Sequence, residues 1–109
     1  MKWKICIDEP FENCSRIFPT QQKSVNKLIT TFSRDSNVRR IIIFGSSVTS
    51  ACNPWSDIDI YVELDEDRKL PKYDVEESVD LWTNFLVDER LFREIKEHGV
   101  EVYERTDAA

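Results

Sequence analysis

Long apolar runs, an excess of basic residues and paired cysteines are all missing from this 109-residue chain. No apolar stretch approaches the ~20 residues that a membrane-spanning helix needs. The apolar part of the first six residues, MKWKIC, is too short for a signal peptide. We therefore expect a cytoplasmic protein without a membrane segment.

Basic residues are outnumbered by acidic ones. There are 15 Lys and Arg against 21 Asp and Glu, so the formal net charge is −6, and the pI is about 4.8. Binding to nucleic acid without regard to its sequence requires Lys and Arg that neutralise phosphates. The charge balance therefore argues against a polynucleotide partner.

The three cysteines, Cys6, Cys14 and Cys52, are odd in number and lack the spacing of metal ligands. Reduced thiols are the expectation, rather than disulfides or a zinc site. The only histidine, His98, falls in the last turn of a predicted helix, where it suits the negative end of the helix dipole. We assign it no catalytic role.

The chain length allows one domain over residues 1–109, with a modest core and no separate acceptor-binding domain. Residues 1–18 form an N-terminal extension in this scheme. Apolar and polar residues alternate before Pro10, which is compatible with a short extra strand.

The most informative stretch runs over residues 38–64. Its first part, VRRIIIF, predicts a strand over 38–44 that is buried on both faces and ends at Gly45. A turn at Gly45 and Ser46, followed by a short helix over 47–51, would leave backbone N–H groups and a hydroxyl facing an anion. For this dipeptide alone, an ordinary turn at the end of a strand is the commoner explanation.

The second part, DIDIYVEL over residues 57–64, alternates strictly and predicts a half-buried strand. Asp57 and Asp59 then lie on one face, roughly 6–7 Å apart. Their repulsion is on the order of 2–3 kcal/mol at an effective dielectric constant of ~20, and a divalent cation would reverse its sign. Hard carboxylate oxygens suit Mg²⁺. The pair alone is also compatible with a solvated strand face that binds nothing.

Together the two parts, FGSSVTSACNPWSDID, resemble the signature of the polymerase-β-like nucleotidyltransferase superfamily, in which Gly-Ser precedes Asp-x-Asp by about ten residues. The likeness covers residues 20–104, and the short chain with the ending IKEHGVEVYE resembles the small stand-alone minimal nucleotidyltransferases. The fold implied is a small α/β (α+β) core, with a mixed, largely antiparallel sheet flanked by helices.

The resemblance also implies roles for individual residues. The triphosphate would lie on the turn formed by Gly45, Ser46 and Ser47. The metal-binding and catalytic carboxylates would be Asp57, Asp59 and a third on a following strand, Asp80 in SVDLW. Two Mg²⁺ ions, with Mn²⁺ as a substitute, would assist a hydroxyl in attacking the α-phosphorus of ATP, so that pyrophosphate leaves.

Flanking segments complete the predicted fold. A helix begins at Thr20 as its N-cap and buries an apolar stripe. A second helix has Asp88 as N-cap and Gly99 at C′, and a last strand covers 100–104. Arg39 and Arg40 are expected to be edge charges. Residues 65–77 are predicted to form a solvated, charged loop.

The chain departs from the family pattern in its charges. Members commonly carry Arg just after Gly-Ser, whereas no Lys or Arg lies between Arg40 and Arg68. Three functions therefore stay open: transfer of AMP to a partner protein, a catalytically weak or inactive antitoxin that binds a HEPN-domain partner, and transfer to a small molecule of the antibiotic type. The presence of all three carboxylates favours the first.

Overall fold

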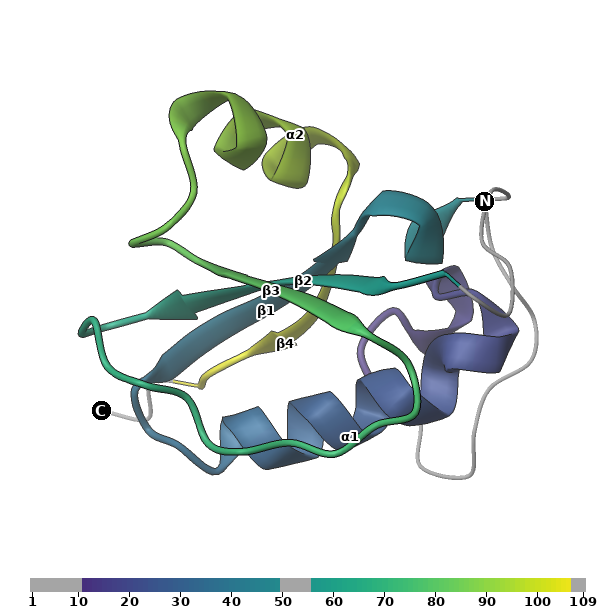
Figure 1. The fold of residues 1–109 in the computed structure, drawn as a ribbon, viewed down its shortest axis with the longest axis horizontal. Coiled ribbons are helices and arrows are strands. Elements are labelled where there is room, and N and C mark those ends of the chain that lie inside the picture. Colours follow the sequence, from purple (N-terminus) through teal and green to yellow (C-terminus); the bar gives the residue numbers. More distant parts are fainter. Residues whose placement is uncertain (1–10, 50–55, 107–109) are drawn as a thin grey trace.

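The computed structural model describes residues 11–49 and 56–106, which form a four-stranded sheet with one α-helix on each face (Figure 1). The strands are β1 (Val38–Phe44), β2 (Ile58–Leu64), β3 (Val79–Thr83) and β4 (Val100–Glu104), and the helices are α1 (Gln22–Ser33) and α2 (Glu89–His98). In the order β3-β2-β1-β4, only β2 and β3 run parallel. The predicted mixed, largely antiparallel sheet is therefore confirmed. The strand predicted before Pro10 lies outside the described residues.

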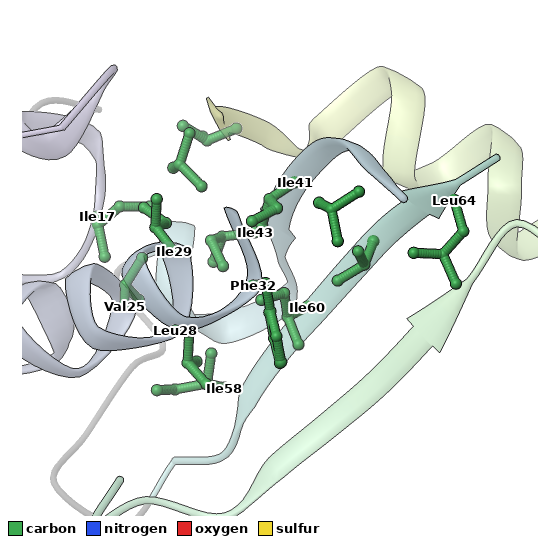
Figure 2. Packing of buried hydrophobic residues seen from close by; sticks show 14 residues of the cluster. Ile17, Val25, Leu28, Ile29, Phe32, Ile41, Ile43, Ile58, Ile60 and Leu64 are labelled. Atoms are coloured by element: carbon green, nitrogen blue, oxygen red, sulfur yellow. The ribbon is translucent and has the colours of Figure 1, made fainter. Parts of the chain in front are cut away.

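The main core lies between α1 and one face of the sheet (Figure 2). Residues of α1 at helical spacing, Val25, Leu28, Ile29 and Phe32, are buried against alternate residues of the strands, Ile41, Ile43, Ile58, Ile60, Val62, Leu64, Val100 and Val102. Burying an aliphatic side chain contributes roughly 1.5–3 kcal/mol relative to leaving it exposed, so this layer is the main source of stability. The helical and strand periodicities read from the sequence meet in this layer.

A smaller cluster lies on the other face, beneath α2. Phe44, Tyr61 and Ile95 are its buried members. The Tyr61 ring is 1% exposed and lies 6.1 Å from the Phe92 ring, centroid to centroid. The face of β2 that carries Asp59 is therefore only partly open, because α2 covers its middle.

The start of α1 differs from the prediction. A 3-10 turn over Pro19–Gln21 precedes the helix, and its N-cap is Gln21, which makes no side-chain capping bond. Gln22 is completely buried and donates from Nε2 to the Ile17 carbonyl at 3.0 Å. Thr20 is therefore not the N-cap, because the chain enters the helix through the 3-10 turn.

At α2 the predicted N-cap is confirmed, since the Asp88 carboxylate accepts a hydrogen bond from the Leu91 N–H at 2.7 Å. The predicted reason for glycine at position 99, a C′ residue that ends the helix, is wrong. Gly99 has φ −72°, which any residue adopts. A Cβ at this position would collide with the Ile42 side chain and the Ile95 carbonyl. Close packing of α2 onto β1 therefore accounts for glycine here.

Arg39 and Arg40 are not edge charges, because β1 is an interior strand. They form an ion-pair network with carboxylates of the neighbouring segments, Glu63, Asp65, Glu101 and Glu104. The closest contact is 2.7 Å, from Arg40 Nε to Glu101 Oε1. These two arginines lie at the end of β1 opposite Gly45.

The connection between the parallel strands, residues 65–78, runs back along α1 (Figure 1). The Tyr73 ring packs edge-on against Phe32 at 5.6 Å, and Leu70 and Val75 pack against the main core. The prediction of a solvated loop is therefore wrong for these three residues, which pack against the core or α1. No helix in residues 11–49 and 56–106 is long and apolar enough to cross a membrane.

Gly99→Ala should lower the free energy of unfolding by about 1–3 kcal/mol, because the new methyl group overpacks the α2–β1 contact. The measurement is urea unfolding followed by circular dichroism. Glu97→Ala, an exposed substitution two residues away, is the control and should change stability by less than about 0.5 kcal/mol. Equal stability of Gly99→Ala and the wild-type protein would contradict the packing explanation.

Candidate functional site

Three chain segments meet at one end of the sheet. The carboxyl end of β1 lies beside the amino ends of β2 and β3, because β1 is antiparallel to β2 and β2 is parallel to β3. In the strand register, Asp59 is the partner of Phe44 on one side and of Asp80 on the other. The turn that begins at Gly45 therefore lies next to two carboxylates from different strands.

The Gly45 turn is a 3-10 turn over Gly45–Val48, so the predicted helix over 47–51 is wrong in its described part. Gly45 has φ +71°, a conformation that favours glycine. A Cβ here would overlap the Asp59 carboxylate. Glycine is therefore required at this position both by the backbone and by the approach of Asp59.

The two serines of the turn differ. Ser46 is half-buried, and its carbonyl accepts hydrogen bonds from the Thr49 N–H at 3.0 Å and from Thr49 Oγ1 at 3.2 Å. Ser47 is completely buried, and its carbonyl accepts from the Phe18 N–H at 2.9 Å. Its hydroxyl has no hydrogen-bond partner among the described residues. Of these two serines, only Ser46 is partly exposed to solvent.

Asp59 and Asp80 form a close pair. The pKa of Asp59 is raised to about 6, most of all by burial and then by a hydrogen bond with the Asp80 side chain. The charges of Asp80, Asp57 and Glu94 add to this effect. Two carboxylates this close favour a shared proton or a cation between them.

Asp57 lies one residue before β2, is exposed, and lines a cavity of about 480 Å³ beside the start of α1. Its charge still reaches Asp59. The three carboxylates thus divide into a contact pair and a third member on the side of the cavity.

The donor set suits a hard divalent cation. Mg²⁺ is usually held by one or two carboxylates, with substrate phosphates and water completing its ligands. Within residues 11–49 and 56–106, no three His, Cys, Asp or Glu side chains form a ready-made metal site. The Asp59–Asp80 pair fits this mode of binding, in which the substrate brings the remaining ligands.

Glu94 is the acidic neighbour that the sequence analysis missed. It comes from α2, 35 positions after Asp59, and its charge contributes to the raised pKa of Asp59. It is exposed, and it precedes the buried Ile95 on the helix that covers this face of the sheet. No spacing rule links a helix residue to an Asp-x-Asp strand, so only the fold brings them together.

One comparison with known proteins gives a match. The model of the family described as "Polymerase beta, Nucleotidyltransferase" matches residues 26–108, which include the Gly45 turn and all three aspartates. No curated protein matches the chain.

Gly45→Ala should destabilise the protein by roughly 1–3 kcal/mol, through the left-handed backbone and the overlap with Asp59. It should also weaken nucleotide binding, because Asp59 must move. Thermal unfolding and calorimetric titration with a nucleotide measure the two effects. Ser46→Ala is the matched control and should keep wild-type stability. A Gly45→Ala protein as stable as Ser46→Ala would contradict the close approach.

Asp59→Asn should remove a specific pH dependence of stability in the absence of metal. Because the folded pKa of Asp59 is raised to about 6, its favourable contribution is complete below about pH 4 and is lost as pH rises through about 6. The variant should therefore gain stability relative to the wild type between pH 4 and 7. Urea unfolding across this range measures it, and a pH-independent difference would contradict the raised pKa.

Glu63→Gln is the control for Asp59→Asn. It removes a carboxylate from the same strand, but one that pairs with Arg39 and Arg40. We expect it to lower stability modestly and to leave Mg²⁺-dependent nucleotide binding intact, whereas Asp59→Asn should abolish that binding.

Proposed function

Since the chain belongs to the polymerase β nucleotidyltransferase family, we propose that it transfers AMP from ATP, with Mg²⁺, to a hydroxyl group of a partner protein. Pyrophosphate is the second product. The observation that carries the proposal is the hydrogen-bonded pair of Asp59 and Asp80, held against the Gly45 turn by the strand register. A close pair of like charges with one partly buried member costs free energy, and a cationic ligand would offset that cost.

Each residue has a task in this reaction. The turn at Gly45 and Ser46 positions the phosphates, while Asp57, Asp59 and Asp80 would hold the metal cations. Asp80 is exposed on the strand at the edge of the sheet, so it can accept the proton of an incoming hydroxyl. Bound Mg²⁺ supplies charge neutralisation at the α-phosphate and lowers the pKa of the attacking hydroxyl. Positioning and electrostatics together lower the barrier.

A protein hydroxyl is the acceptor that best fits the surface. The chain carries a net charge of −6, which disfavours a polynucleotide. Asp80 and Glu94 are both exposed near Asp59, so the acceptor meets a negative surface. A Tyr, Ser or Thr hydroxyl on a partner such as a HEPN-domain protein is uncharged and is delivered on its own scaffold.

The second candidate function is a binding-only antitoxin with the nucleotidyltransferase fold. The observation that favours it is the absence of Lys and Arg from the motif between Arg40 and Arg68. In that case the carboxylates would remain as an acidic surface that covers a HEPN-type partner without modifying it.

The position of the transferred label separates these functions. With [α-³²P]ATP and Mg²⁺, label should reach a hydroxyl of the purified partner, whereas label from the γ-phosphate should leave in pyrophosphate. Asp80→Asn should lower transfer by at least about 100-fold, in line with the loss of a general base. Asp67→Asn, an exposed acid in the 65–78 connection, should leave it unchanged.

Transfer of the γ-label would overturn the proposal, since it indicates a kinase. Stable binding of the partner with no transfer in Mg²⁺ or Mn²⁺ would favour the binding-only antitoxin. Label that reaches a small metabolite or antibiotic, but no protein, would favour a small-molecule acceptor.

A further inference from the structure

In the proposed reaction, the negative charge of the triphosphate has to be balanced by positive charge. A triphosphate is strongly anionic, and Asp57, Asp59, Asp80 and Glu94 surround the place where its α-phosphate would lie. At an effective dielectric constant of ~20, each uncompensated pair of like charges a few ångströms apart costs on the order of 2–4 kcal/mol. Divalent cations offset part of this cost. The motif itself offers no Lys or Arg, so further positive charge has to come from another segment.

The cavity beside Asp57 brings such a segment to the site. Its volume is about 480 Å³, and one wall is the first two turns of α1. The rest of its lining includes Ser56, Asp57 and the end of the connection that leads into β3. Ser24 Oγ donates to Glu77 Oε1 at 2.8 Å, which holds this connection against the helix. The cavity therefore opens directly beside one of the proposed metal-binding carboxylates.

Two lysines lie on the helical wall. Lys23 and Lys27 are one helical turn apart, so they share a side of α1, and both are exposed. Neither makes an ion pair with the described part of the chain. Four arginines of the described residues, in contrast, already form ion pairs with carboxylates: Arg39, Arg40, Arg68 and Arg105.

A buried amide ties the start of α1 to Ser56, another residue of the cavity lining. Gln21 is 2% exposed, and its Nε2 donates to the Ser56 carbonyl at 3.0 Å. Its Oε1 is buried and has no hydrogen-bond partner within the described residues. A buried acceptor without a partner is uncommon in native proteins.

We propose that Lys23 and Lys27 bind the β- and γ-phosphates of the nucleoside triphosphate in this cavity and replace the basic residue that the motif lacks. This inference rests on the proposed function. The distal phosphates are assigned here because Asp57, one of the proposed metal-binding carboxylates, lines the cavity. Asp59 and Asp80 pair with each other and do not belong to its lining.

Two carboxylates in the cavity set a limit on the ligand. Glu76 and Glu77 line the same cavity as the lysines. Glu77 already accepts a hydrogen bond from the Ser24 hydroxyl, which also belongs to the lining. A chain of phosphates with a bound cation suits a cavity that holds both lysines and carboxylates better than a bare anion does.

The test is calorimetric titration of the full chain with Mg²⁺ and α,β-methylene-ATP, which cannot be cleaved at the reacting bond. Lys23→Gln/Lys27→Gln should weaken binding by at least about tenfold, and the loss should shrink to less than about twofold with AMP. The control is Lys69→Gln/Lys96→Gln. It removes the same charge from two exposed lysines outside this cavity, and it should change either affinity by less than about twofold.

The outcomes separate this inference from the proposed function. If the wild-type chain binds neither nucleotide, both are overturned. If the wild type binds and Lys23→Gln/Lys27→Gln binds equally well, only the lysine assignment fails. Equal losses for the ATP analogue and AMP would place the lysines near the α-phosphate or the nucleoside, which also contradicts the assignment. A thermal unfolding curve like that of the wild type shows that the variant is folded.

Discussion

The contact between the Asp59 carboxylate and Gly45 determines the geometry of the whole site. It exists because the last residue of β1 is the register partner of Asp59, so the chain must turn away at once. Only a residue without a side chain fits between the turn and the carboxylate. The same register places Asp80 on the other side of Asp59. The pairing of β1 with β2 thus sets the distance from the Gly45 turn to Asp59, and the pairing of β2 with β3 sets the distance from Asp59 to Asp80.

Charge explains why the site is arranged in this way. Three acidic side chains, Asp57, Asp80 and Glu94, raise the pKa of Asp59, and the motif has no Lys or Arg within its own sequence. The arginines of β1 lie at the far end of the strand, where they form ion pairs with carboxylates such as Glu63 and Glu101. In the proposed reaction, positive charge for the substrate would come from bound cations and from the lysines of α1. The protein separates its structural ion pairs from the proposed catalytic carboxylates along the length of one sheet.

Much of the fold could be predicted from the sequence because its signals are local. Alternation over residues 57–64, the apolar stripe of α1 and the Asp88 cap all have the predicted partners. The errors concern features that depend on tertiary contacts. Gly99 was predicted to end a helix, but glycine is required there because a side chain would collide with Ile42. Arg39 was predicted to lie on an edge strand, but its strand is interior.

The candidate site shows the same division. Gly45, Ser46, Asp57, Asp59 and Asp80 could be selected by spacing and by resemblance, and the structure brings Gly45, Asp59 and Asp80 into contact or register. Glu94, Gln21 and the two lysines of α1 could not be found in this way. They come from helices, and their separation in sequence from the Asp-x-Asp motif does not indicate where they lie in the fold. The binding roles of all these residues remain predictions.

The parallel pairing of β2 and β3 also affects how the site is assembled during folding. β1 and β2 form an antiparallel pair, whereas β3 can dock only after residues 65–78 have crossed back along α1. Closing that crossover costs chain entropy before any strand contact forms. The docking step then brings Asp80 against Asp59, so it adds electrostatic repulsion to the entropic cost. A proton or a divalent cation removes that repulsion, and so it favours attachment of the edge strand as well as chemistry at the finished site.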